Sequence, residues 1–173
     1  MLPYTLCFCR CGDAVLMLYR ARPPVAYQWN GVGGKIEPGE TPLACVWREV
    51  EEETGLDLRA AEAVRFAGLV RWGPGGAIGH RTGMYVFIAD LVPGYPIWED
   101  ERLVPEGCLS WKPLPWVCDP KNTTVVDNIP HFLPAMLMGP APLEYRCDYS
   151  EGLLARVTAR PLRMLSGMSI AQM

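Results

Sequence analysis

Residues 34–56 constrain this chain more than any other stretch, because they combine fixed residue types with fixed spacing. Their sequence is GKIEPGETPLACVWREVEEETGL. Glycines stand near both ends, and a dense run of Arg and Glu residues fills the second half. A motif of this kind is confirmed by its context, so the residues of the stretch are considered first as a local structure and then for their chemistry.

The middle of this stretch is predicted to be a helix. Thr41 suits the N-cap, Pro42 suits the first helical position, and Gly55 suits the C-terminal stop. Between these signals, apolar residues recur at i, i+3, i+4 and i+7 and therefore form one apolar face. These residues are Leu43, Val46, Trp47 and Val50.

Three carboxylates share the neighbouring face, because Glu49, Glu52 and Glu53 also recur at i, i+3 and i+4. A solvated acidic face is the common explanation for a Glu-rich helix. The alternative is a set of hard oxygen ligands for a divalent cation, Mg²⁺ first and Mn²⁺ as a substitute. Arg48 lies at i, i+4 from Glu52, where it can brace that carboxylate.

The stretch resembles a complete Nudix box, the signature of the MutT/Nudix hydrolase superfamily, and this context favours metal binding. The resemblance implies an α/β/α sandwich in which the box packs against a mixed sheet. It also implies that Glu49, Glu52 and Glu53 carry the metal ions, with the Gly33 carbonyl as a further ligand. Arg48 would orient a box carboxylate, and Glu49 or Glu53 would deprotonate the attacking water.

Other residues resemble the branch that contains the oxidised-purine nucleoside triphosphate diphosphatases, a similarity that covers residues 3–161. Glu106, five residues before Trp111, matches a distal carboxylate ligand of that branch. Glu101 is its rival, because its Asp-Glu context also fits. The further matches are Tyr4-Thr5, Arg20, Trp29-Asn30-Gly31, Phe132-Leu133-Pro134 and a terminal hairpin.

Several residues are candidates to contact a nucleotide. Asn30 leads because its amide offers both a donor and an acceptor to a purine edge, although an Asn before Gly is also a common turn residue. Trp29 and Trp72 can stack on a base or belong to the core. The remaining candidates are Arg20 and Lys35 for phosphate, Thr5, and Asp127 with Asn128, near the place where related enzymes keep base-reading acids.

The predicted fold class is α/β (α+β), with strands at 4–11, 14–20, 63–72, 83–92 and 109–114, and a helix at 129–138. Residues 143–149 and 153–161 read as the terminal hairpin. We expect residues 1–161 to form a single domain. The tail, residues 162–173, shows no clear pattern and is expected to be disordered.

Charge and composition limit the partners. The 173 residues carry a formal net charge of −3, which gives no general attraction to nucleic acid polymers or anionic membranes. The N-terminus lacks the pattern of a signal peptide, and no apolar run approaches the ~18 residues of a membrane span. We therefore expect a cytoplasmic protein whose partner is a nucleotide substrate. The oligomeric state stays open.

The seven cysteines are odd in number and scattered in spacing, which argues against a disulfide framework. We expect buried, reduced thiols. Cys7, Cys9 and Cys11 alternate, so on a strand they would point to one face.

The resemblance thus implies a Mg²⁺-dependent hydrolase that converts a nucleoside triphosphate to the monophosphate and pyrophosphate, and 8-oxo-dGTP is the first substrate to expect. Another guanine polyphosphate, such as an alarmone, is the second substrate class. A ligand sensor without catalysis is the alternative outside the enzymes. Such domains usually lose box carboxylates, whereas this chain keeps all of them.

Overall fold

The computed structural model describes residues 1–23, 25–74, 82–139 and 141–162. Within these residues the chain forms nine strands, three α-helices and one short 3₁₀ helix, η1 (Leu58–Ala60). The helices are α1 (Pro42–Thr54), α2 (Leu114–Val117) and α3 (Ile129–Met138). The strands are β1 (Tyr4–Cys11), β2 (Ala14–Arg20), β3 (Trp29–Asn30), β4 (Ala61–Pro74), β5 (Gly83–Leu91), β6 (Arg102–Val104), β7 (Gly107–Pro113), β8 (Leu143–Ser150) and β9 (Leu153–Pro161).

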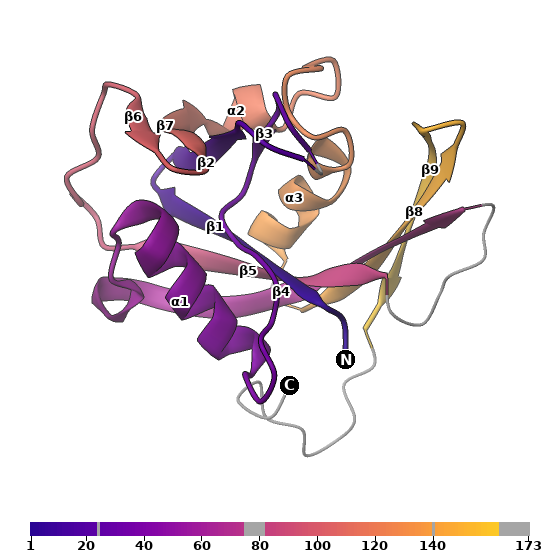
Figure 1. Ribbon diagram of the computed structural model, residues 1–173, viewed down its shortest axis with the longest axis horizontal. Helices are drawn as coiled ribbons and strands as arrows, with labels where there is room; N and C mark the ends of the chain where they lie inside the picture. Colours follow the sequence, from indigo (N-terminus) through magenta and orange to yellow (C-terminus); the bar gives the residue numbers. More distant parts are fainter. Residues whose placement is uncertain (24, 75–81, 140, 163–173) are drawn as a thin grey trace.

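These strands form one mixed sheet in the order β6-β7-β2-β1-β5-β4-β8-β9, with β3 paired to β2. β1 runs parallel to β5, and β4 runs parallel to β8, whereas the other named pairs are antiparallel. The β8–β9 hairpin forms one edge of the sheet, and β6 with β7 forms the other (Figure 1). The predicted mixed sheet and terminal hairpin are confirmed.

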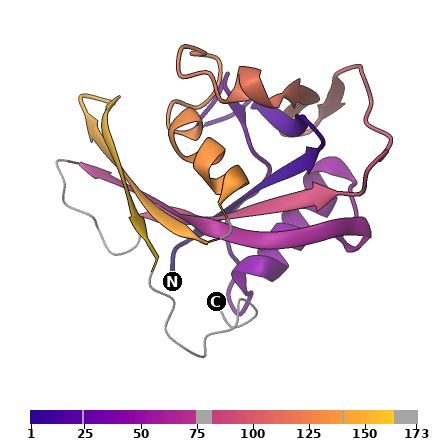
Figure 2. The ribbon, with the colours of Figure 1, turned by 180° about the vertical axis from the view of Figure 1, so that it is seen from behind.

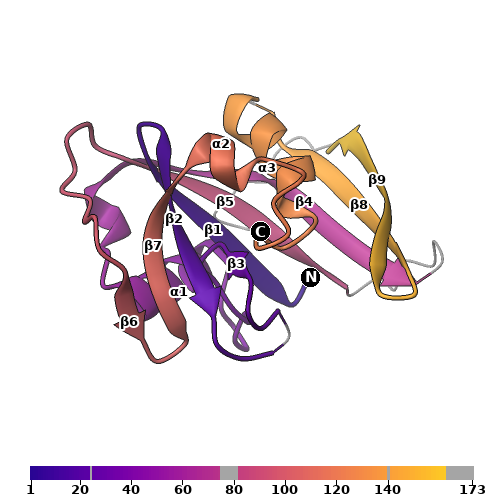
Figure 3. The same ribbon diagram turned by 90° about the horizontal axis from the view of Figure 1, so that it is seen from above.

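The sheet is covered on both faces, and β1 shows why. Leu6 and Phe8 alternate with Cys7 and Cys9, so the two pairs point to opposite faces. Leu6 and Phe8 belong to a core cluster with the apolar side chains of α3, whereas Cys7 and Cys9 belong to a cluster with those of α1. The views from behind and from above show α1 on one face and α3 on the other (Figures 2 and 3). The predicted α/β/α arrangement is confirmed.

The predicted boundaries of α1 are confirmed by its caps. Thr41 Oγ1 accepts a hydrogen bond from Ala44 N at 3.2 Å, an N-cap contact worth ~1 kcal/mol. Gly55 ends the helix in the left-handed conformation with φ 73°, and its N–H donates to the Glu51 carbonyl at 2.9 Å.

The apolar face of α1 is narrower than the sequence predicts. Val46 and Val50 are fully buried against the sheet, but Trp47 is 37% exposed. The Arg59 guanidinium lies 5.8 Å from the centre of the Trp47 ring. Trp47 therefore lies at the rim of the helix–sheet contact, where a cation covers it.

Short elements are the main difference from the predicted fold. The sequence does not indicate four short elements, namely β3, β6, η1 and α2. Each has only two to four residues, which are too few to show a helical or strand periodicity. β4 is longer than the predicted 63–72. Most of the predicted loop 73–79 and of the predicted tail lies outside the described residues. No helix in the described part of the chain is long and apolar enough to cross a membrane.

Candidate active site

The glycine loop before α1 is held against β1 by backbone hydrogen bonds. The Val32 carbonyl accepts from Cys7 N at 2.7 Å, and the Gly34 carbonyl accepts from Thr5 N at 2.9 Å. Gly33 lies between them with φ 153°, and a Cβ there would collide with the Thr5 carbonyl oxygen. Only glycine fits this position. The Gly33 carbonyl makes no hydrogen bond with any described residue, so it is free to bind a ligand.

Glu53 is the buried carboxylate of the site. Its side chain extends from the last turn of α1, the residue is 8% exposed, and Oε2 accepts a hydrogen bond from Gly33 N at 3.1 Å. The pKa of Glu53 is raised to about 7, mainly by burial and also by the charges of Glu49 and Glu106. The Gly33 N–H and the Arg20 charge act in the opposite direction. Glu53 can therefore gain or lose a proton near neutral pH.

Arg48 gathers three carboxylates at once. Its Nε and Nη2 donate to both oxygens of Glu40, at 2.9 and 3.0 Å. Its Nη1 donates to Glu49 at 2.8 Å and to the more exposed Glu52 at 3.2 Å. The Arg48 hydrogen bonds hold the pKa of Glu40 below its usual value. The Glu52 contact follows the i, i+4 spacing, whereas the two-pronged contact with Glu40 was not predicted.

Gly34 makes room for Glu49. A Cβ at Gly34 would overlap the Glu49 carboxylate. Any side chain at this position would push Glu49 away from the loop, so the glycine keeps the carboxylate between the loop and Arg48.

The register between β2 and β7 brings Glu106 close to Glu53. Arg20 pairs with Gly107, and Ala21 N donates to the Glu106 carbonyl at 2.9 Å. Glu106 Oε2 is buried without a hydrogen-bond partner among the described residues, and its charge acts on Glu53.

The rival carboxylate, Glu101, is 57% exposed at its side chain and is already engaged. It accepts hydrogen bonds from Lys112 Nζ at 3.3 Å and from Cys108 Sγ at 3.4 Å. The geometry therefore favours Glu106 over Glu101 as a partner of the box.

The carboxylates do not converge as a finished metal site. Within the described ranges, no three His, Cys, Asp or Glu side chains lie close enough together to hold a metal ion. Glu49 and Glu52 turn toward Arg48 instead. The donor set nevertheless fits a hard dication, because Glu53, the unpartnered Glu106 Oε2 and the Gly33 carbonyl are all oxygen donors.

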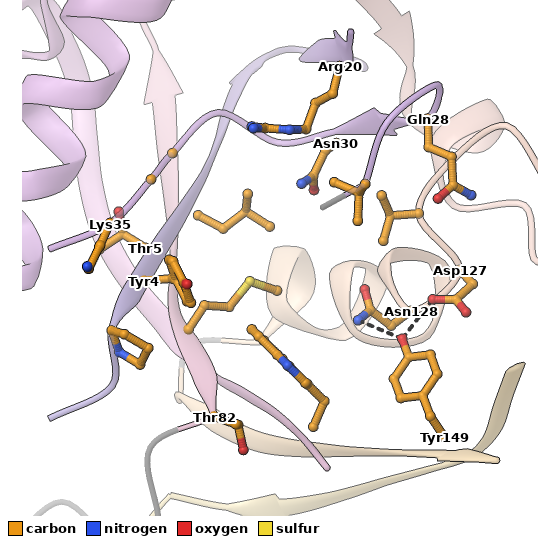
Figure 4. A pocket seen from close by; sticks show the side chains of 18 residues that line it. Tyr4, Thr5, Arg20, Gln28, Asn30, Lys35, Thr82, Asp127, Asn128 and Tyr149 are labelled. Atoms are coloured by element: carbon orange, nitrogen blue, oxygen red, sulfur yellow. Dashed lines mark hydrogen bonds between the residues drawn. The ribbon is translucent and has the colours of Figure 1, made fainter. Parts of the chain in front are cut away.

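A cavity of about 840 Å³ runs from this loop across the sheet. Its lining includes all but one of the residues predicted to contact substrate, namely Thr5, Arg20, Asn30, Lys35 and Asp127. Trp72, Asn128, Gly33 and Gly34 also line it. Figure 4 shows Lys35 and Thr5 on one side of the cavity and Asp127, Asn128 and Tyr149 on the other.

Trp29 is the exception among these predicted contacts. It is 8% exposed and packs between Tyr19 and Trp116, with ring centroids 5.2 and 6.4 Å away. It belongs to the core cluster beside α3 and does not line the cavity. Trp29 is therefore a core residue and not a stacking surface for a base, because other aromatic side chains enclose its ring.

Asn30 has one half of its amide engaged. Its Oδ1 accepts a hydrogen bond from Gly31 N at 2.9 Å, and the residue lies in the strand β3. The side chain also lines the cavity, so its NH₂ group remains as a donor. The turn alternative is therefore wrong for Asn30, because the residue pairs with Leu18 in the sheet, whereas contact with a ligand stays a prediction. Nearby, Arg20 Nε is buried without a hydrogen-bond partner among the described residues.

Tyr149 is a cavity residue that the sequence did not single out. Its hydroxyl donates to Asp127 Oδ1 at 2.8 Å and accepts from Asn128 Nδ2 at 3.2 Å. Parallel pairing of β8 with β4 carries it to the cavity. Local sequence patterns do not report such pairing between distant strands.

Comparison with known proteins agrees with this geometry. Residues 3–134 match the family described as the NUDIX domain. The chain belongs to the Nudix family. The predicted membership and the predicted enzyme class, a Nudix hydrolase, are therefore confirmed, and residues 34–56 are its Nudix box.

Relatives and solved structures support this membership. "Uncharacterized Nudix hydrolase YvcI" of Bacillus subtilis is 31% identical over 136 residues, which cover 78% of each protein. "Putative 8-oxo-dGTP diphosphatase 2" of Mycobacterium tuberculosis is 36% identical over 92 residues, which cover 53% of this chain and 62% of that protein. The crystal structure of a mutator MutT protein from Bacillus halodurans covers 94% of this chain and 100% of its own, with a TM-score of 0.71 and 24% identity. This last likeness shows the Nudix fold.

Proposed function

We propose that this Nudix hydrolase cleaves an oxidised purine nucleoside triphosphate, 8-oxo-dGTP, to the monophosphate and pyrophosphate. The observation that carries the proposal is the cavity itself. It joins the box loop and Arg20, beside the buried Glu53, to a second end where Asn128 Oδ1 has no hydrogen-bond partner among the described residues. A nucleotide would use both ends, because its phosphates bind to cations and its base binds through hydrogen bonds. The mycobacterial relative named for this activity supports the choice of substrate.

The phosphate end provides positive charge and oxygen ligands. Arg20 and Lys35 line it, and both can contact phosphate oxygens. Glu49, Glu52, Glu53, Glu106 and the Gly33 carbonyl are the groups that would hold Mg²⁺ or Mn²⁺. When bound, these ions would neutralise phosphate charge and acidify a water molecule.

The carboxylates of the chain contribute by their position relative to the attacking water. In the reaction, a P–O bond forms to the attacking water, and the P–O bond to the leaving phosphate oxygen breaks. We assign the proton of that water to Glu53, because this buried carboxylate accepts a hydrogen bond from Gly33 N alone among the described residues and no cationic side chain there donates to it. Glu49 is the weaker candidate, since Arg48 already donates to it at 2.8 Å.

The base end offers one donor and one acceptor. Asn30 keeps its NH₂ group, and Asn128 Oδ1 is buried without a partner among the described residues. An oxidised guanine carries a carbonyl at C8 and a hydrogen on N7, so it presents an acceptor beside a donor. Unmodified guanine has a lone pair at N7, which would face an acceptor unfavourably. One such mismatch costs ~1–3 kcal/mol, or roughly 5- to 150-fold in efficiency.

The test is pyrophosphate release from 8-oxo-dGTP, dGTP and a guanosine polyphosphate in the presence of Mg²⁺. We expect the highest kcat/KM on 8-oxo-dGTP. Equal efficiency on 8-oxo-dGTP and dGTP, or preference for the guanosine polyphosphate, would refute the oxidised-base proposal and leave the hydrolase class intact. Absence of turnover on every nucleotide would favour the ligand sensor.

A further inference from the structure

Asn128 is an unusual buried amide. The residue is 7% exposed, lines the cavity and has a buried Oδ1 without a partner among the described residues. It stands at the N-cap of α3, where an Asn oxygen normally accepts a backbone N–H, yet it makes no cap hydrogen bond. A buried acceptor without a hydrogen-bond donor destabilises the folded protein. A ligand that donates a hydrogen bond to Asn128 Oδ1 would therefore satisfy this oxygen.

The hydrogen bonds of Tyr149 explain why this oxygen is left free. A tyrosine hydroxyl has a single proton to donate. Asp127 lies 2.8 Å away, and an ionised carboxylate only accepts hydrogen bonds, so the proton is directed to Asp127. The hydroxyl oxygen must then accept from Asn128, which fixes the Nδ2 side of the amide toward Tyr149 at 3.2 Å. Figure 4 shows this chain of hydrogen bonds from Asn128 through Tyr149 to Asp127.

Burial and the nearby Asp127 carboxylate raise the pKa of Tyr149. The hydroxyl therefore keeps its proton over the physiological range, and the direction of the chain does not change with pH there. Without this hydroxyl, the amide could rotate by half a turn and offer a donor in place of an acceptor at little cost.

We propose that Tyr149 is a specificity-determining positioning residue, which holds the Asn128 amide with Oδ1 as a fixed acceptor for a purine N–H. The inference rests on the proposed function and adds to it a residue of β8, beyond the residues 3–134 that match the family. Tyr149 acts through Asn128 and does not itself select the base. On an oxidised purine, the N–H is that of N7.

The experiment is a double-mutant cycle read by calorimetric binding of 8-oxo-dGMP and dGMP, with wild type, Tyr149→Phe, Asn128→Ala and the double variant. We expect Tyr149→Phe to reduce the preference for 8-oxo-dGMP by about fivefold or more. In the Asn128→Ala background, the same substitution should cause no further loss, because Tyr149 has nothing left to orient. In turnover of 8-oxo-dGTP, Tyr149→Phe should raise KM and leave kcat nearly unchanged.

Tyr145→Phe is the matched control, since Tyr145 is on the same strand but does not line the cavity. It should retain the wild-type preference, and thermal unfolding should show all variants folded. A wild-type preference in Tyr149→Phe, or an equal loss in both backgrounds, would overturn the positioning role while the proposed function stands. If wild type binds both nucleotides equally, or neither, the oxidised-base substrate and the positioning role both fall.

Discussion

Glu53→Gln tests the site sharply, because it keeps the shape of the side chain and removes one buried charge. The glutamine carbonyl can still accept the hydrogen bond that Gly33 N donates to Glu53 Oε2 at 3.1 Å. The fold should therefore survive. Turnover should fall by at least ~100-fold, the scale of losing a major electrostatic contribution to catalysis.

Without metal, the same substitution should stabilise the protein in a pH-dependent way. Burial raises the pKa of Glu53 from 4.5 to about 7 in the folded protein, so the folded chain holds this proton more tightly than the unfolded chain. That contribution to stability is complete below the unfolded pKa and is lost as the pH rises through the folded pKa. Wild type should therefore lose roughly 2–3 kcal/mol from this group between pH 5 and pH 8. The neutral glutamine loses none of it.

The assay is urea unfolding in EDTA at pH 5 and pH 8, together with turnover in Mg²⁺. Glu51→Gln is the control, since Glu51 is an exposed acid on the same helix. It should follow wild type in both pH dependence and turnover. If wild type and Glu53→Gln change equally in stability between the two pH values, the buried-charge reasoning is wrong. Near-normal turnover of Glu53→Gln would refute its role in catalysis.

Four further predictions concern other parts of the chain. Mass spectrometry of the non-reduced protein should find seven free thiols, and a disulfide-linked peptide would contradict this. Within that set, Cys147 should resist alkylation until the protein is denatured, because burial raises its pKa to about 12. Arg48→Lys should lower the free energy of unfolding by about 1–2 kcal/mol in urea titrations, because an ammonium cannot contact both Glu40 oxygens side by side. Asn30→Ala should raise KM for 8-oxo-dGTP more than it lowers kcat, and steady-state kinetics showing a loss confined to kcat would contradict the base contact.

The parts of the fold that the sequence predicted are those encoded locally. The caps of α1 and its apolar repeat lie within a few turns of one helix, so Thr41 and Gly55 define its ends. Strand alternation likewise predicts that Cys7 and Cys9 share one face, and the structure shows that this face packs against α1. Such signals need no knowledge of the rest of the chain.

The parts that the sequence could not predict depend on register between distant segments. Trp29 is an aromatic beside a glycine loop, and only its packing with Tyr19 and Trp116 places it in the core. The approach of Glu106 to Glu53 follows from the pairing of β2 with β7. Tyr149 reaches the cavity only through the pairing of β8 with β4.

That last pairing has a consequence for how the protein folds. β4 finds its parallel partner, β8, only after all the intervening chain has been synthesised, with Gly68 opposite Leu143. Contacts between segments so far apart in sequence form slowly. The Nudix box and its helix can therefore be in place while one wall of the cavity is still missing. Until β8 arrives, the edge of β4 is an open template for incorrect strand pairing. A chain cut before residue 143 would keep the carboxylates of the box together with Asn128, but it would lack Tyr149, whose hydroxyl contacts the Asn128 amide.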